Sequence, residues 1–127
     1  MGSRIIIKRM SDHNVVDSHI CGAIREVLIG NDYNFLNLAI SIDIGITQAH
    51  FHEKFDEIYF VLDGNIKLLL YEAESQRTWT QDLGENELCV IPAFVHHKII
   101  EASQKNRVCF ITIPQFNEKD QHISEVI

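Results

Sequence analysis

Three side chains that can bind a metal ion lie close together in the stretch GITQAHFHEKFDEIYFVLDG, which begins at Gly45 and ends at Gly64. They are His50, His52 and Glu57. Successive side chains of a strand point to opposite faces, so His50 and His52 point the same way if their segment is extended. The two imidazoles can then hold one ion between them.

A further metal ligand must be chosen between His96 and His97. In a strand, His96 shares a face with Lys98, which favours solvent, whereas His97 shares a face with Ile99. Strand alternation therefore favours His97, with His96 as the alternative. Any one of these histidines alone would suit a surface position, but three imidazoles and a carboxylate together are typical of a site for a divalent transition metal.

Two neighbouring side chains are candidates for the same pocket. Tyr59 shares parity with Glu57, so it either supplies a phenol near the ion or serves as a core aromatic residue. Gln48 shares parity with His50 and His52 and is a candidate to face the site. The remaining histidines lie in polar surroundings and are expected at the surface: His13, His19 and His122.

The elements that must position these residues are mostly strands. Residues 33–44 alternate apolar and polar positions and predict a half-buried strand. Asp63 and Gly64 separate two β-prone runs, at residues 58–62 and 66–71, and predict a hairpin. Further strands are expected at residues 4–9, 77–81, 87–91, 97–102 and 107–113, a turn-like segment at 11–18, a helix at 20–29, and a loop or short turn from 115 onward. Many short strands with little helix indicate a sandwich or barrel.

Length and charge narrow the possible functions. The chain of 127 residues fits one domain, residues 1–127, and its net charge of −7 with scattered basic residues argues against a nucleic-acid partner. It contains no apolar run of the roughly 20 residues that a membrane-spanning helix needs and no signal-peptide pattern, so a cytoplasmic location is expected. The odd, widely spaced cysteines are expected as reduced, core-forming thiols: Cys21, Cys89 and Cys109.

The motif spacing now supports a family resemblance. His50-x-His52, four residues, Glu57, six residues and Gly64 resemble the first cupin motif, and residues 84–97 (GENELCVIPAFVHH) resemble the second. The resemblance implies an all-β fold, a double-stranded β-helix or jelly-roll barrel. It also implies one divalent ion held by His50, His52, Glu57 and His97.

The chain departs from the family pattern at three places. Four residues rather than five separate Gly45 from His50, and Phe94 stands where the second motif usually has glycine. The Asn that often follows the last histidine is missing, and Glu101 is the nearest residue to it. None of these departures removes a ligand.

The ligand set does not select one metal, since iron, manganese, nickel, cobalt, copper and zinc all suit it. An octahedral ion with these four ligands keeps two positions open, which favours a substrate that binds through two oxygens. We expect a metal-dependent isomerase, epimerase or dehydratase acting on a small carbohydrate-like or carbonyl metabolite, with Glu57 as base and Tyr59 as acid. The alternatives are an iron-dependent dioxygenase and a small-molecule binding or sensing module without turnover.

The C-terminal residues Pro114-x-Phe116 and Asp120-x-His122 resemble the end of small single-domain cupins described as mannose-6-phosphate-isomerase-like. They also look like the tail of cupin dehydratases that act on nucleoside-derived sugars. The family resemblance further implies a homodimer, and the apolar run at residues 5–7 would be an edge strand that a second subunit could cover.

Overall fold

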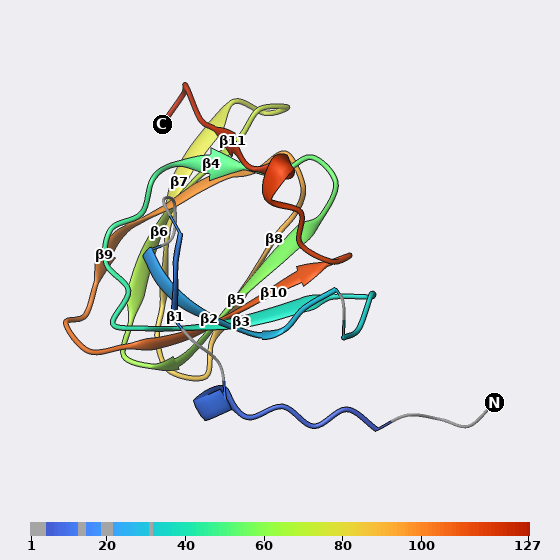
Figure 1. The fold of residues 1–127 in the computed structure, drawn as a ribbon. Coiled ribbons are helices and arrows are strands. Elements are labelled where there is room, and N and C mark those ends of the chain that lie inside the picture. Colours follow the sequence, from blue (N-terminus) through green and yellow to red (C-terminus); the bar gives the residue numbers. More distant parts are fainter. Residues whose placement is uncertain (1–4, 13–14, 19–21, 31) are drawn as a thin grey trace.

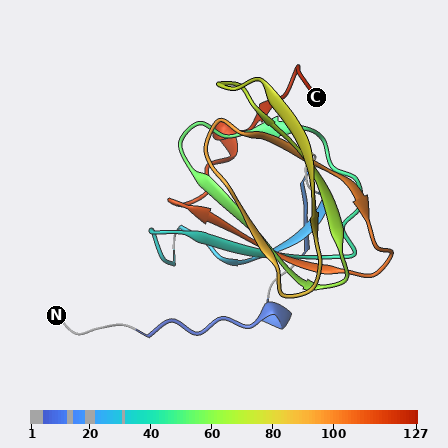
Figure 2. The same ribbon diagram turned by 180° about the vertical axis from the view of Figure 1, so that it is seen from behind.

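The structure, a computed structural model, describes residues 5–12, 15–18, 22–30 and 32–127. Two antiparallel sheets face each other and close into a jelly-roll barrel, as Figures 1 and 2 show from opposite sides. The strands are β1 (Val15–Ser18), β2 (Gly22–Leu28), β3 (Asn37–Ile42), β4 (His50–Phe51), β5 (Asp56–Asp63), β6 (Ile66–Glu72), β7 (Arg77–Leu83), β8 (Leu88–Ile91), β9 (His96–Ala102), β10 (Arg107–Ile113) and β11 (His122–Ile123). The all-β prediction is confirmed.

The strand order places segments from distant parts of the chain side by side. One sheet has the order β1-β2-β3-β10-β5-β8 and the other the order β11-β4-β9-β6-β7. Two short 3-10 helices, η1 (Met10–Asp12) and η2 (Glu118–Asp120), complete the described elements. No helix in the described part of the chain is long and apolar enough to cross a membrane.

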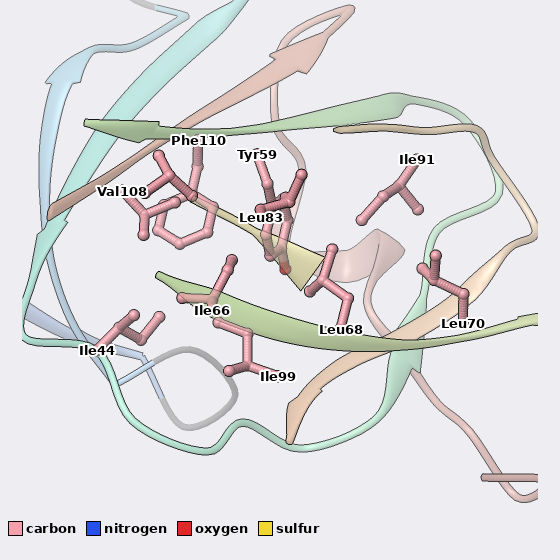
Figure 3. Close-up of a cluster of buried hydrophobic side chains, with 11 residues drawn as sticks. Ile44, Tyr59, Ile66, Leu68, Leu70, Leu83, Ile91, Ile99, Val108 and Phe110 are labelled. Carbon is pink, nitrogen blue, oxygen red and sulfur yellow. The ribbon is translucent and has the colours of Figure 1, made fainter. Parts of the chain in front are cut away.

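The apolar core lies inside the barrel and adjoins the candidate metal ligands. Inward positions along β5 run from Glu57 through Tyr59 to Val61, and those along β9 run from His97 to Ile99; all five side chains are buried. Figure 3 shows the core cluster, which consists of Ile44, Tyr59, Val61, Ile66, Leu68, Leu70, Leu83, Ile91, Ile99, Val108 and Phe110. The candidate ligands border this cluster, because Glu57 pairs with Ile91 and His97 pairs with Leu70 on neighbouring strands.

The turn at Asp63 and Gly64 is present, but the predicted hairpin is wrong. Gly64 has a positive φ of 80°, the conformation that glycine adopts without steric cost. However, β5 and β6 belong to different sheets, so the turn crosses from one sheet to the other. The hairpin partner of β6 is β7, through a turn that ends at Gln76.

Three predictions for the N-terminal part are wrong. Residues 5–9 form no strand, and Figure 1 shows this segment running away from the barrel, with Ile5 86% exposed. The predicted turn at 11–18 contains β1, and the helix predicted at 20–29 is strand β2. Ile24 and Leu28 are four residues apart, a spacing that lies on one face of a helix and equally on one face of a strand, so it did not separate the two.

Strand β3 turns its smaller and more polar side chains inward. Ser41 is completely buried, whereas Ile42 is 43% exposed. The cross-strand partners of Asn37 and Ala39 on β10 are Thr112 and Phe110, both buried. This direction fits the cavity that the inward face of β3 lines together with Glu57.

The outer face of the six-stranded sheet is correspondingly apolar. Two rows of paired residues cross four strands of it: Leu38, Ile111, Ile58 and Val90, then Ile40, Cys109, Phe60 and Leu88. Leu88 and Val90 on the edge strand β8 are each about half exposed, at 51% and 52%. We call these eight residues the outer apolar face.

Candidate metal centre

Four side chains from separate parts of the chain meet inside the barrel, next to the apolar core. His50 lies on β4, His52 directly follows that strand, Glu57 lies on β5, and His97 lies on β9. All four are buried, and one ligand atom from each lies within 4.8 Å of the others. The structure therefore brings together the residues that the sequence pattern predicted as metal ligands.

Backbone carbonyls orient the three imidazole rings. A carbonyl oxygen can only accept a hydrogen bond, so each Nδ1 that contacts one must carry the proton. The acceptors are the carbonyl of Gln48 for His50 (2.9 Å), of Asp120 for His52 (2.7 Å) and of Val95 for His97 (3.0 Å). This tautomer leaves the lone pair on Nε2 of every ring, the arrangement in which an imidazole binds a metal.

The atoms that point inward have no hydrogen-bond partner within the protein. They are Nε2 of His50, His52 and His97, and Oε1 of Glu57. Glu57 Oε1 lies 3.3 Å from His97 Nε2 and 3.9 Å from His52 Nε2. Leaving a buried polar atom unpaired costs roughly 1–3 kcal/mol. Four such atoms around one point fit a divalent ion, which would satisfy them all.

Burial favours the protonation states that binding requires. Desolvation, with help from the neighbouring His97, lowers the pKa of His50 from 6.5 to about 3. Desolvation also lowers the pKa of His52. For Glu57, burial alone would raise the pKa, but the surrounding histidines, His97 above all, lower it overall. At neutral pH the site thus offers neutral imidazoles at His50 and His52 and a carboxylate at Glu57.

The C-terminal tail holds the ligand loop through Asp120, a role that the sequence reasoning missed. Its buried carboxylate accepts hydrogen bonds from the N–H groups of Glu53 (2.9 Å) and Lys54 (2.8 Å), and its carbonyl accepts from His52. Burial alone would raise the pKa of Asp120, but the two N–H donors, together with His122, lower it overall. The only sequence signal was the pattern Asp120-x-His122.

His96 and His122 lie outside the metal cluster. The His96 ring stacks on Phe51 with centroids 4.2 Å apart, and its Nδ1 lies 2.7 Å from Ser124 Oγ. His122 also stacks on Phe51 and lies 2.9 Å from an Asp120 carboxylate oxygen. His122 was predicted as a solvated surface residue, and its side chain is 36% exposed, with these contacts covering the rest. His13 and His19 lie outside the described residues.

The other candidate pocket residues differ in their surroundings. Tyr59 belongs to the buried core cluster, with its ring edge-on to His97 at 5.7 Å between centroids. Gln48 is exposed and contributes its carbonyl oxygen to His50. Phe94 is 56% exposed and has a φ of 72°. The backbone at this position, where the second motif usually has glycine, is therefore left-handed although the residue has a side chain.

Of the two described cysteines, Cys89 packs against the core cluster as expected, whereas Cys109 lies on the outer apolar face. Cys89 and Cys109 are free and partly buried, and burial raises the pKa of each thiol. Cys21 lies outside the described residues.

A jelly-roll barrel that gathers three histidines and a glutamate in its interior defines a metal-binding β-barrel of the cupin type. The family model described as Cupin matches residues 35–126, which is most of the chain. The chain therefore belongs to the cupin family. Compared by sequence with curated proteins, it has no significant match.

Solved structures agree on the fold. A variant of Bacillus subtilis oxalate decarboxylase gives a TM-score of 0.78 at 19% identity, covering 97% of this chain and 33% of the other. The chain thus spans about a third of the length of that enzyme. A protein from Planctomyces limnophilus gives 0.72 at 20% identity, covering 97% of both chains. A variant of Streptomyces PAC13 with uridine gives 0.72 at 14% identity, covering 98% of this chain and 94% of the other.

Proposed function

We propose that this protein is a metal-dependent enzyme that moves a proton next to a carbonyl group of a small carbohydrate-like metabolite, as an isomerase, epimerase or dehydratase does. The observation that carries the proposal is the convergence of four buried, unpaired ligand atoms next to a cavity that Glu57 lines. Glu57 belongs to both features, because it is one of the four and also lines the cavity.

Each of the site residues has a separate role in this proposal. His50, His52, Glu57 and His97 hold one divalent ion, which when bound supplies a Lewis acid that stabilises negative charge on a substrate oxygen. The Glu57 carboxylate, at the cavity wall, is our candidate to accept the proton. Tyr59 is our candidate acid, although it is buried in the core and is not among the described cavity-lining residues.

Two structural relatives support parts of this proposal. One structure of the B. subtilis oxalate decarboxylase is described by its Mn(II) centres; it has a TM-score of 0.75 and 18% identity to this chain. PAC13, which matches this chain over almost its full length, is described with uridine, a ligand that contains a sugar. The first supports metal dependence, and the second supports a carbohydrate-like substrate.

Solvent exchange tests the reaction class without knowledge of the substrate. The protein loaded in turn with Mn(II), Fe(II) and Zn(II) is incubated in D2O with a panel of sugars, hydroxy ketones and keto acids. Proton NMR should show deuterium entering a C–H position next to a carbonyl in at least one compound, and Glu57→Gln should abolish that exchange. Oxygen consumption with Fe(II) instead would favour the dioxygenase alternative. Binding without exchange or product formation would favour the sensing module.

We also propose that the protein forms a homodimer through the outer apolar face. Eight paired apolar residues on four strands form a continuous surface that is not buried within the described chain. Exposed apolar patches larger than a few hundred Å² are uncommon on monomers and mark interaction sites. The same surface on a second copy is a complementary partner, because a two-fold interface joins like to like.

A further inference from the structure

A cavity of about 180 Å³ lies next to the candidate metal centre. Inward side chains of β2, β3 and β10 form its walls, Glu57 of β5 joins it to the ligand cluster, and Phe116 and Gln121 of the C-terminal tail also line it. At about 30 Å³ per molecule of liquid water, the space equals roughly six waters. It is large enough for a sugar ring, and the tail stands at its rim.

The sheet register explains why a cavity exists at this place. One inward row runs from Tyr59 through Phe110 and Ala39 to Glu26 on four adjacent strands. Ala39 is the smallest side chain of this row and leaves space between Phe110 and the Glu26 carboxylate. Glu26 is therefore a carboxylate on the inner face of the barrel, at a wall of the cavity.

A second inward row carries unsatisfied polar atoms into the same cavity. Glu57 pairs with Thr112, and Thr112 pairs with Asn37. Thr112 is only 4% exposed, yet its Oγ1 has no hydrogen-bond partner within the protein, and neither does Oδ1 of Asn37. Buried polar atoms are nearly always satisfied in folded proteins. A ligand that carries hydroxyl groups would satisfy both.

The charge of the cavity wall limits what can enter. The wall carries three carboxylates, Glu26, Glu57 and Glu118, and none of the lining residues that the structure describes is Lys, Arg or His. A divalent ion at the metal centre would offset two of these negative charges. Binding a phosphate or a dicarboxylate normally uses cationic side chains or backbone N–H donors. The rest of the wall is mainly apolar and includes Phe110 and Phe116, which suit the face of a ring.

We infer that this cavity binds a neutral, polyhydroxylated ligand such as an unphosphorylated sugar or nucleoside, and discriminates against sugar phosphates and dicarboxylates. Thr112, Asn37 and Glu26 contact the ligand hydroxyls, and the carboxylates disfavour a second anion. The inference rests on the proposed function for its metal centre and narrows the substrate class. It separates this protein from cupins whose substrates are anionic, such as oxalate.

Matched ligand pairs test the inference. The Zn(II)-loaded protein is diamagnetic, so saturation-transfer NMR can measure binding of D-ribose against D-ribose 5-phosphate, and of uridine against uridine 5′-monophosphate. We expect the neutral member of at least one pair to bind ten-fold or more tightly than its phosphate ester. Equal or tighter binding of both phosphate esters would overturn the inference, and so would the absence of binding by both neutral members at 50 mM.

Two variants test whether residues of the cavity wall cause the preference for neutral ligands. Thr112→Val removes the unpaired hydroxyl at nearly constant volume, so it should weaken binding of the neutral ligand about five-fold or more without lowering Tm. Glu26→Gln removes one negative charge. It should therefore reduce the ratio of the affinity for the neutral ligand to the affinity for its phosphate ester. Thr80→Val, at an exposed position of β7, is the matched control. It should change neither the affinity for the neutral ligand nor the preference over the phosphate ester. Unchanged ligand binding in both wall variants would overturn the assignment.

Zinc stoichiometry, measured on the same samples, separates this inference from the proposed function. One zinc per chain combined with no preference for neutral ligands would overturn only the inference. A failure to bind any divalent metal would instead remove the basis of the proposed function, whatever the sugar pairs show.

Discussion

His50 and His97 are direct partners on the neighbouring strands β4 and β9, with ring centroids 4.3 Å apart. The Nδ1 of each ring bonds to the carbonyl oxygen two residues earlier in its own chain segment, that of Gln48 or Val95. The strand register sets the spacing of these two ligands, and the local backbone sets their tautomer. The site is thus organised by the barrel before any ion binds.

Acid should destabilise the metal-free protein through His50. The pKa of His50 is lowered from 6.5 to about 3, mainly by burial, so between these pH values the folded state binds fewer protons than the unfolded chain. The stability is therefore present above pH 6.5 and is lost as the pH falls toward about 3. The pKa of Glu57 is also lowered, and it acts in the same direction below its ordinary value of 4.5.

Urea unfolding of the chelator-treated protein at a series of pH values measures this effect. The midpoint should fall steadily through the acid range, and His50→Asn should flatten the dependence because it removes the depressed group. A midpoint that stays constant or rises on acidification would contradict the buried, neutral state of His50.

Replacing Asp120 with Asn should loosen the ligand loop. The amide keeps one acceptor oxygen where the carboxylate uses two for the N–H groups of Glu53 and Lys54. We expect a loss of about 1–3 kcal/mol in the free energy of unfolding. Metal affinity should fall roughly ten-fold or more, because a loosened loop also shifts the Asp120 backbone carbonyl that accepts the Nδ1 proton of His52. Denaturant unfolding and metal titration measure the two effects.

The exposed tail carboxylate Glu125 provides the control for Asp120. Glu125→Gln should leave stability within about 0.5 kcal/mol of the wild type and metal affinity unchanged. If the Asp120 and Glu125 variants have the same stability and metal affinity, the Asp120 carboxylate does not hold the ligand loop in place.

Phe94 should show the energetic cost of its backbone conformation. Its φ of 72° lies in the left-handed region, which costs a residue with a side chain about 1–2 kcal/mol and glycine almost nothing. Phe94→Gly and Phe94→Ala both remove the exposed ring, so they differ mainly in this cost. We expect the Gly variant to be more stable than the Ala variant by about 1 kcal/mol, as measured by thermal unfolding. An Ala variant of equal or higher stability would show that the backbone relaxes there.

The sequence identified the four residues that cluster in the structure because strand alternation and motif spacing are local signals. The pair His96 and His97 shows this well: the adjacent residues point to opposite faces, and only His97 reaches the cluster. Strand β10 was predicted with the observed bounds, residues 107–113, since a β-branched run ends there at a proline.

What the sequence could not provide were partners distant in the chain. Asp120 binds Glu53 and Lys54 from 67 and 66 residues away, and no local pattern encodes that contact. The prediction of a hairpin at Asp63 and Gly64 was wrong for the same reason. The residue types predict a turn but not the sheet that the next strand joins. The inward direction of Asn37 depends on a polar cavity that only the assembled barrel creates.

The dimer proposal predicts a change in mass on disrupting the outer apolar face. Light scattering after size-exclusion chromatography should give twice the chain mass of 14.6 kDa for the wild type and the single chain mass for Val90→Glu. The physical reason is that a charge placed in an apolar interface must be desolvated without a partner. Thr80→Glu, at an exposed position in the other sheet, is the control and should remain dimeric. A wild type that is monomeric at all concentrations would refute the dimer.

The most direct test of the metal centre is the metal content of three proteins purified and loaded identically: the wild type, His97→Ala and His96→Ala. Elemental analysis by mass spectrometry should find about one divalent ion per chain in the wild type and in His96→Ala, and at least a ten-fold lower affinity or a clear loss of metal in His97→Ala. Full metal content in His97→Ala together with loss in His96→Ala would contradict the ligand assignment, and no bound metal in any of the three would contradict the metal centre itself.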